Sequence, residues 1–409
     1  MESATFLTRV VLENYKSIAH CDVCLGPLNY LVGPNGAGKS NFLDALRFVA
    51  DALKHSVGQA LRSRGGGAAI CHAPHHREGR FRVRLEFSAR DGAVGHYALT
   101  VGHREKTPSA PWEVQEEVLT LPPRPGEANA GLAGRPPDHQ SIFGGRLALA
   151  CVADHPAYRE VYAALTRMLF YNIKPRNIED VVTFDPSQFL PSDGSNLAST
   201  FFRLGAGEEG AADRINDYLR LILPGLIKVR AEPVIPQETE LPPDAPKVAL
   251  LFEQGFRGGG VHLFWPSQMS EGTLRSLGIV TALLQATVAE GPRPSLVGIE
   301  EPEAQVHPAA LAALRDAMVE ASYSTQVLVT TQSPDILDSK DVSTDSILAV
   351  SAEDGATRIA PIDANGRDLI RRRLFTPGEL LRIGQIFPER SPNGAPSPPA
   401  QPAPVGGGN

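Results

Sequence analysis

The stretch Gly33–Ser40 constrains the fold of this chain more than any other, because it matches the pattern G-x-x-x-x-G-K-[ST] at every fixed position. Glycines in this pattern let backbone N–H groups close around phosphates, since no Cβ stands in the way. The apolar run 28–32 predicts a buried strand leading into the loop, and apolar residues at helical spacing predict a helix leading out: Phe42, Leu46, Val49 and Leu53. This order of strand, loop and helix is the context that the pattern requires, so we expect a phosphate-binding loop on an α/β fold.

The loop also carries the polar groups that a nucleoside triphosphate and Mg²⁺ require. Lys39 can reach the β and γ phosphates, and the Ser40 hydroxyl can ligate the metal. The helix that follows directs its positive N-terminus at the phosphates. We therefore expect a nucleotide-binding set made of Gly33, Asn35, Gly36, Ala37, Gly38, Lys39, Ser40 and Asn41.

Composition limits the class of protein. The 409 residues include 42% hydrophobic residues, enough for a sizeable core, but no apolar run reaches the roughly 18 residues of a membrane span. The N-terminus lacks the apolar segment of a signal peptide, and four cysteines make no disulfide framework. We therefore expect a soluble cytoplasmic protein without a membrane partner.

Charge gives no general attraction to nucleic acid, because the net charge is −7. Any contact with DNA must come from a local patch, and the segment Arg62–Arg84 is a candidate, since it holds six arginines against one glutamate. A solvated loop explains this segment equally well.

Cysteine and histidine spacing raises the alternative of a metal site. Cys21 and Cys24 form a C-x-x-C, and four further residues of metal-ligating type follow, namely Cys71, His72, His75 and His76. The cysteine pair lies in a predicted strand, where residues three apart face opposite sides and cannot chelate together. We therefore favour strand cysteines and a solvated histidine-rich loop over a zinc site.

Polar residues at two places after residue 260 suit a nucleotide site. Ser270, Glu271 and Gly272 precede a predicted helix, so that a small hydroxyl residue and a glycine make an anion site there, although a simple N-cap explains them too. The apolar strand 295–299 ends in two adjacent carboxylates, Glu300 and Glu301. One of them can hold the Mg²⁺ shell while the next faces the γ-phosphate and its attacking water.

These stretches together resemble the ATPase heads of the RecF/SMC type within the ABC ATPases. The resemblance rests on Val10–Ile18, Gly26–Asn29, the phosphate loop and Asn41–Leu46 at one end. At the other end it rests on the signature-like segment Met269–Gly272, the Walker B-like Glu300–Glu301, the D-loop-like Ala304–Pro308 and Thr330–Pro334. The chain is similar to predicted AAA-family ATPases of the AAA_21 kind, which are related to the heads of OLD-type proteins.

The resemblance implies a role for each matched residue. ATP is the implied nucleotide, Glu300 takes the metal position together with Ser40, and Glu301 takes the position of the general base. Lys16 lies where a basic residue approaches the phosphates in that group, although a solvated turn lysine is the alternative. Gln332 replaces the usual switch histidine and cannot carry a proton, which predicts slow hydrolysis. Ser270, Glu271 and Gly272 would meet the γ-phosphate bound by a second subunit, so ATP would bridge a homodimer.

The implied fold is an α/β P-loop NTPase of the ABC/SMC-head type, with a mixed sheet, an antiparallel β subdomain and a helical insertion. We divide the chain into an N-terminal half of the head (1–100), an insertion lobe (101–260), a C-terminal half (261–388) and a disordered tail (389–409). Among local elements, we expect a hairpin of Phe81–Phe87 with Gly95–Val101, a strand at Leu147–Val152, helices at Tyr158–Tyr171 and Ala212–Leu223, and a last helix from Thr376 to about Phe387. The middle of the chain contains no sustained heptads, so we expect no long coiled-coil arm.

Two classes of function remain open. In the first, an ATP-bound dimer of heads acts on DNA in repair or recombination. In the second, ATP controls a regulatory or anti-phage defence protein that recruits a protein effector, which the acidic net charge and Gln332 favour. A small-molecule kinase is less favoured because kinases need no signature segment, and the inserts do not resemble those of a transporter subunit.

Overall fold

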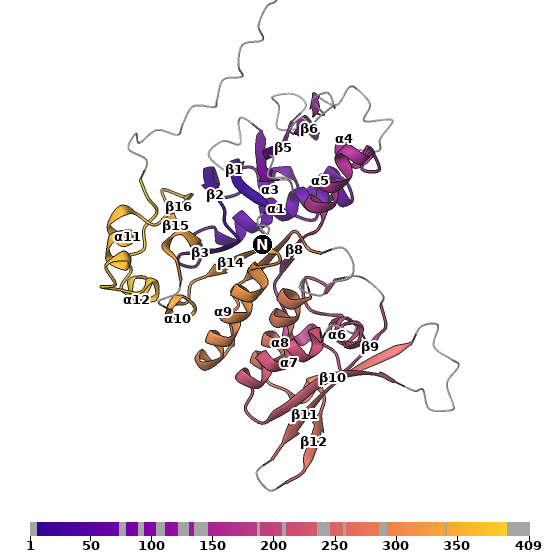
Figure 1. The fold of residues 1–409 in the computed structure, drawn as a ribbon. Coiled ribbons are helices and arrows are strands. Elements are labelled where there is room, and N and C mark those ends of the chain that lie inside the picture. Colours follow the sequence, from indigo (N-terminus) through magenta and orange to yellow (C-terminus); the bar gives the residue numbers. More distant parts are fainter. Residues whose placement is uncertain are drawn as a thin grey trace, which may run out of the picture.

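The computed structural model describes residues 6–72, 79–88, 94–103, 111–121, 131–134, 146–185, 189–206, 210–234, 246–256, 259–285, 293–339 and 342–390. His75, His76 and all but the first two residues of the predicted tail 389–409 lie outside the described residues. Three β-sheets and their covering helices make up the described part of the chain (Figure 1).

A six-stranded sheet at the centre of the molecule carries the phosphate loop, and its strand order is β16-β15-β3-β14-β13-β8. The strands from β15 to β8 run parallel to one another, and β16 is antiparallel to β15 at the edge. Their bounds are β3 (Leu28–Val32), β8 (Met168–Tyr171), β13 (Leu296–Glu300), β14 (Gln326–Thr331), β15 (Ile347–Glu353) and β16 (Ala356–Pro361). Because the strands are parallel, the loops after β3, β13 and β14 all leave from one edge of the sheet.

The central strands place their side chains in two separate cores. Leu31, Leu296 and Leu328 pack on the face covered by α1 (Lys39–Lys54). Their neighbours Val32, Val297 and Val329 pack on the opposite face, together with residues of α8 (Glu271–Leu284) and α9 (Pro308–Ser322). Since successive strand residues face opposite sides, a sheet covered on both faces requires such uninterrupted apolar runs.

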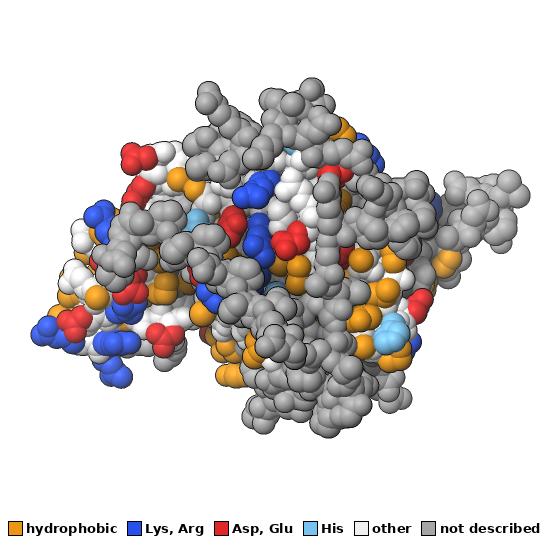
Figure 2. Space-filling view, turned by 90° about the horizontal axis from the view of Figure 1, so that it is seen from above, with side chains coloured by type: hydrophobic (Ala, Val, Ile, Leu, Met, Phe, Trp, Pro, Cys, Tyr) orange, Lys and Arg blue, Asp and Glu red, His pale blue; other side chains and the backbone are white. Residues whose placement is uncertain are grey.

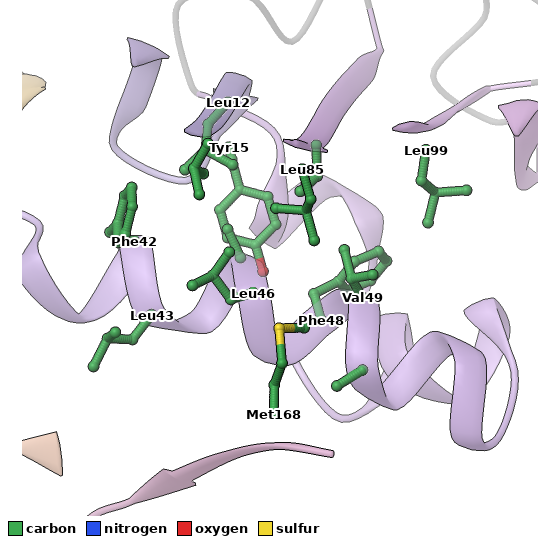
Figure 3. Close-up of a cluster of buried hydrophobic side chains, with 14 of the residues drawn as sticks. Leu12, Tyr15, Phe42, Leu43, Leu46, Phe48, Val49, Leu85, Leu99 and Met168 are labelled. Carbon is green, nitrogen blue, oxygen red and sulfur yellow. The ribbon is translucent and has the colours of Figure 1, made fainter. Parts of the chain in front are cut away.

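A second six-stranded sheet, of order β2-β1-β4-β5-β6-β7, is antiparallel throughout and packs on the other side of α1. Figure 3 shows Leu12, Tyr15 and Leu85 of this sheet on one side of α1 and Met168 of β8 on the other. The predicted hairpin is β4–β5 and is confirmed. The bounds are β1 (Leu7–Tyr15), β2 (Ile18–Cys24), β4 (Arg80–Ser88), β5 (Val94–His103), β6 (Trp112–Thr120) and β7 (Gly131–Gly134).

A third sheet lies in the lower lobe of Figure 1, where β11 pairs antiparallel with each of β9, β10 and β12. Val229, Leu250 and Phe252 of this sheet share a core with α6 and α7. The helix predicted at Ala212–Leu223 is α7 and is confirmed. The bounds are β9 (Val181–Thr183), β10 (Leu226–Val234), β11 (Lys247–Gly255), β12 (Val261–Phe264), α6 (Leu197–Ala206) and α7 (Ala211–Ile222).

Shorter helices complete the fold. They are α2 (Val57–Arg62), α3 (Gly67–Ile70), α4 (Ala148–Cys151), α5 (Pro156–Thr166), α10 (Pro334–Leu337), α11 (Ala364–Arg371) and α12 (Pro377–Arg382). Within the described ranges, every helix is too short or too polar to cross a bilayer.

Two local predictions were wrong because distant residues decide the structure there. Leu147–Val152 forms the one-turn helix α4 and not a strand, since the buried carboxylate of Glu117 accepts hydrogen bonds from the Ala148 and Leu149 N–H groups at its start. The predicted helix Tyr158–Tyr171 ends at Thr166, and its last four residues form β8, which pairs with β13.

The last helix is shorter than predicted and ends at Arg382 instead of near Phe387. Its capping box at Thr376 and Glu379 is present as predicted. Gly384 adopts φ +68°, its N–H donates to the Leu381 carbonyl, and the Gln385 N–H donates to the Leu380 carbonyl. This left-handed glycine terminates the helix.

Candidate nucleotide site

The carboxyl edge of the central sheet brings the predicted motifs together. The phosphate loop follows β3, Glu300 ends β13, and the switch segment with Gln332 follows β14. The strand register places Glu300 beside Thr330, and Thr331 beside Val32. Burial lowers the pKa of Lys39, while the negative charges of Glu301 and Glu303 oppose that shift, which indicates that both carboxylates lie near the ammonium group.

The phosphate loop wraps around its own lysine. The Lys39 ammonium donates hydrogen bonds to the Gly33 carbonyl at 2.7 Å and the Pro34 carbonyl at 2.9 Å, and the residue is 4% exposed. Gly36 and Gly38 have φ values of +76° and +101°, which glycine adopts without a steric penalty. Asn35 and Ser40 are exposed, so their polar groups remain accessible to a ligand.

Thr357, Ser17 and Asn41 form a chain of hydrogen bonds that supports the phosphate loop. The direction of each bond in this chain is determined. Since the Ala37 carbonyl can only accept, the Thr357 hydroxyl donates to it at 2.8 Å, and Ser17 Oγ must then donate to Thr357 Oγ1 at 2.6 Å. Asn41 Nδ2 in turn donates to Ser17 Oγ at 2.6 Å. A Cβ on Gly38 would lie 2.0 Å from Thr357 Oγ1, so only glycine fits there.

Lys16 does not lie free in solvent. Its ammonium group pairs with Asp44 of α1 at 2.7 Å. Asp44 also accepts from Arg64 at 2.9 Å and from the Tyr15 hydroxyl at 2.8 Å. Burial would raise the pKa of Asp44, but Arg64 and Lys16 outweigh that effect and lower it. Asp44 therefore stays ionised and ties the turn after β1 to the helix that follows the phosphate loop.

The two Walker B-like carboxylates have different surroundings. Glu300 pairs through Oε1 with Arg47 of α1 at 3.2 Å, and the Arg47 guanidinium lies over the Phe170 ring at 5.4 Å. Glu301 has a left-handed backbone, with φ +43°, and its N–H donates to the Thr330 carbonyl at 2.9 Å. A non-glycine residue in this region is uncommon and is frequently associated with a functional site.

Arg275 of α8 fixes the backbone around these carboxylates, although its sequence context gave it no role. It is 6% exposed and donates to the carbonyls of Glu300 at 3.1 Å, Glu301 at 3.0 Å and Ile173. Burial lowers the pKa of the guanidinium while the nearby glutamates oppose that shift. The helix that starts at the signature-like segment is thereby tied to the end of β13.

The signature-like residues have structural partners within the same chain. Ser270 caps α8, since its Oγ accepts from the Thr273 N–H at 3.1 Å. Glu271 accepts from Gln305 Nε2 at 2.6 Å and pairs with Arg176 at 3.4 Å. A Cβ on Gly272 would lie 2.4 Å from the Gln305 carbonyl oxygen, so the loop after β13 packs closely on this glycine.

The switch segment contacts a residue to which the sequence gave no role. The Gln332 N–H donates to Glu303 Oε1 at 3.0 Å, and the residue is exposed. Glu303 was visible as a third acid after Glu300 and Glu301, but nothing in the sequence showed which groups its side chain would reach.

Acids of the same chain lie next to three of the five described arginines in the arginine-rich segment. Arg64 pairs with Asp44 and Asp51, Arg82 lies 3.8 Å from Glu116, and Arg84 pairs with Glu86. Figure 2 likewise shows basic and acidic side chains next to each other on the face that it presents. Arg62 and Arg80 are exposed, so the described part of this segment keeps some positive charge at the surface.

The Cys/His alternative finds no support in the described residues. Cys21 is buried and Cys24 is exposed, as expected for residues on opposite faces of β2. Within the described ranges, no group of three or more His, Cys, Asp or Glu side chains could hold a metal ion.

Comparison with known proteins agrees with this architecture. A protein-family model described as "AAA domain, putative AbiEii toxin, Type IV TA system" matches residues 28–338. The solved structure of an Smc head bound to the C-winged helix domain of ScpA aligns with a TM-score of 0.52 and 15% identity, covering 88% of this chain and 99% of that one. The predicted P-loop NTPase fold of the ABC/SMC-head type is thus confirmed.

Curated relatives match over short segments. The DNA replication and repair protein RecF of Erwinia tasmaniensis is 40% identical over 67 residues, which are 16% of this chain and 17% of that protein. RecF of Enterobacter sp. (strain 638) is 35% identical over 92 residues, which are 22% of this chain and 23% of that protein. The chain therefore spans less than a quarter of the length of these relatives.

Proposed function

Because the chain belongs to this AAA-domain family and is a RecF/SMC-like ATPase, we propose that it hydrolyses ATP with Mg²⁺ and that ATP joins two of its heads. The observation that carries this function is the convergence of three segments at one edge of the central sheet. They are the phosphate loop, the pair Glu300–Glu301, and Gln332. The negative charge of Glu301, which opposes the lowering of the Lys39 pKa by burial, supports a shared site for phosphate and metal chemistry.

The residues fit a magnesium nucleotide. The Ser40 hydroxyl and the Glu300 carboxylate are the hard oxygen donors that Mg²⁺ prefers, and we assign them to its shell. When bound, Mg²⁺ supplies positive charge against the β and γ phosphates. Lys39 and the backbone N–H groups between Gly33 and Asn41 hold the phosphates, and we assign Lys16 a supporting place behind them through Asp44.

We assign the hydrolysis step to Glu301 and Gln332. Glu301 follows directly on the metal-binding carboxylate and, in this assignment, accepts the proton of the attacking water. Gln332 orients that water by hydrogen bonding, and because an amide cannot accept a proton at neutral pH, it does not replace Glu301 as a base. This division of roles predicts a slow ATPase in which the ATP-bound state persists.

We assign Ser270, Glu271 and Gly272 to the contact with ATP bound by a second copy of the chain. The N-terminus of α8, capped by Ser270, provides a positive dipole end that favours a phosphate. The resulting ATP-bridged homodimer acts on DNA in repair or recombination, a role supported by the segments shared with RecF.

A second function is favoured by the charge arrangement. The internal pairing of Arg64, Arg82 and Arg84, together with a net charge of −7, reduces the positive charge that the described residues of this segment offer to DNA. The family description names a toxin of a toxin–antitoxin system. In this second proposal, the ATP-bound dimer recruits a protein effector in regulation or phage defence.

The mass of the Glu301→Gln variant tests both proposals, because in the proposed mechanism this variant binds ATP without hydrolysing it. We expect a monomer without nucleotide, a dimer with ATP and Mg²⁺, and no dimer when Ser270→Asp is added, because aspartate still caps α8 but places a negative charge against the phosphate. A further mass increase with a short DNA duplex at low salt supports action on DNA. A dimer whose mass does not increase with DNA favours the proposal of a protein effector. A mass that stays that of a monomer under all these conditions refutes the role of the signature-like segment.

A further inference from the structure

Glu303 lies two residues beyond Glu301, and its side chain reaches the end of the neighbouring strand. Its Oε1 atom accepts three hydrogen bonds, from Thr331 Oγ1 at 2.7 Å, the Gln332 N–H at 3.0 Å and the Ser333 N–H at 3.2 Å. Hydrogen bonds to a charged acceptor are stronger than those to a neutral one. A single carboxylate oxygen therefore holds the whole segment that carries Gln332.

The three donors are also linked to one another and to the next helix. The Ser333 N–H donates to Thr331 Oγ1 at 3.0 Å, and Ser333 Oγ accepts from the Asp335 N–H at the start of α10. Thr331 is the last residue of β14. The backbone of Gln332 is thus fixed between the sheet on one side and α10 on the other, with Glu303 at the centre of the hydrogen bonds.

The loop that carries Glu303 has an unusual backbone. Glu301 and Gln305 have φ values of +43° and +64°, in the left-handed region that side chains other than glycine rarely adopt. Such conformations persist where surrounding bonds determine them. The Glu301 N–H donates to the Thr330 carbonyl, and the Glu301 carbonyl accepts from Arg275. The Gln305 backbone packs on Gly272, and its side chain donates to Glu271. The position of Glu303 relative to Glu301 is therefore fixed.

The second carboxylate oxygen makes it possible to separate two roles of this residue. Glu303 Oε2 is buried and has no hydrogen-bond partner in the part of the chain that the structure describes. Glutamine at this position would keep an acceptor at Oε1, but it would remove the negative charge that both oxygens share and place an NH2 group at the unpartnered position. Alanine at this position removes the acceptor. Aspartate has a side chain that is shorter by one methylene group, so its carboxylate lies farther from all three donors.

We propose that Glu303 is a positioning residue for ATP hydrolysis, which holds Gln332 at a fixed place relative to Glu301 so that both address one attacking water. This role rests on the ATPase function proposed above. Glu303 bonds the switch segment and not the phosphate loop, so its loss should lower the rate of hydrolysis while nucleotide binding persists. A shift of about 1 Å in a positioned group can lower a rate about 100-fold.

The test compares turnover and binding in four variants of the full chain. ATP turnover gives kcat and KM, and titration with a non-hydrolysable ATP analogue and Mg²⁺ gives Kd. We expect Glu303→Ala and Glu303→Asp to lower kcat by about 10- to 100-fold with KM and Kd within about threefold of wild type. Glu303→Gln should lower kcat less than Glu303→Ala does, because all three donors keep an acceptor although that acceptor is no longer charged. Glu232→Ala, in β10 of the third sheet, is the control and should change nothing.

The variants also distinguish the possible failures. Full-rate turnover in Glu303→Ala overturns the role, as does a rise in KM at unchanged kcat. Equal losses in Glu303→Ala and Glu303→Gln overturn it too, because the negative charge and not the hydrogen-bond acceptor would then be required. If Glu303→Ala fails to fold, Thr331→Val removes the shortest of the three bonds and must lower kcat by itself. A wild-type chain without ATPase activity refutes the proposed function, and this role with it.

Discussion

Thr357→Val should weaken ATP binding although Thr357 lies outside the phosphate loop. The Thr357 hydroxyl donates to the Ala37 carbonyl at 2.8 Å and accepts from Ser17 at 2.6 Å, and the residue is 4% exposed. Valine has nearly the same shape but removes both bonds and leaves the Ala37 carbonyl without its donor. Each hydrogen bond contributes about 1 kcal/mol, so the conformation of the phosphate loop loses about 2 kcal/mol of stabilising free energy. If this loss destabilises the loop conformation that binds ATP, the Kd for ATP rises about 30-fold.

Thr325→Val is the matched control for this change. Thr325 is 1% exposed, and its hydroxyl donates to the Pro294 carbonyl at 2.8 Å, at the opposite end of β14 from the switch segment. The control should lose about 1 kcal/mol of unfolding free energy and keep the affinity of wild type. Calorimetric titration with an ATP analogue and Mg²⁺, together with urea unfolding, measures both quantities. An ATP affinity of Thr357→Val within twofold of wild type, or an equal loss in Thr325→Val, would refute the reasoning.

Two further changes test the charges around the loop. Arg47→Gln frees Glu300 from a partly exposed ion pair worth about 0.5–1 kcal/mol, so half-maximal ATPase activity should need about two- to fivefold less Mg²⁺. Arg47→Lys keeps the positive charge and should not change this Mg²⁺ requirement. An unchanged Mg²⁺ requirement in Arg47→Gln contradicts the assignment of Glu300 to the metal. Asp44→Asn leaves Lys16 and Arg64 without their shared carboxylate and should cost about 3 kcal/mol of unfolding free energy at pH 7. Because folding lowers the pKa of Asp44, its contribution is complete above about pH 4 and is lost as the pH falls through the folded pKa. Urea unfolding of wild type and variant should therefore converge on acidification, and a constant difference would count against this account.

The sequence predicted the parts of the site that depend on local patterns. The phosphate loop, the strand ending in Glu300 and the helix after Ser270 are each set by neighbours within a few residues, so a pattern of spacing and residue type was sufficient. The supports of the site could not be predicted in this way. Thr357 lies 320 residues from Ala37, and Lys16 finds Asp44 only because β1 packs against α1.

One missed residue did carry a signal in the sequence. Arg275 is the only charged residue between Thr273 and Leu284, and α8 is buried along all of that length. A helix that is apolar on every side is expected inside a protein, where a charge needs several hydrogen-bond partners. The sequence therefore showed that Arg275 must have buried partners, but the pairing of β8 with β13 was needed to show that those partners are backbone carbonyls.

The same arginine explains how the insertion between β8 and β13 keeps a defined position. The chain leaves the central sheet after β8 at Tyr171 and returns to it at β13 by way of the third sheet and α8. Arg275 bonds the Ile173 carbonyl, where the chain leaves, and the carbonyls of Glu300 and Glu301, where it has returned. Since one buried guanidinium contacts both ends, the α8 end of the insertion cannot move away from the nucleotide edge without exposing or stranding that charge. The insertion is thus fastened to the backbone of Glu301, the carboxylate proposed to act as the base.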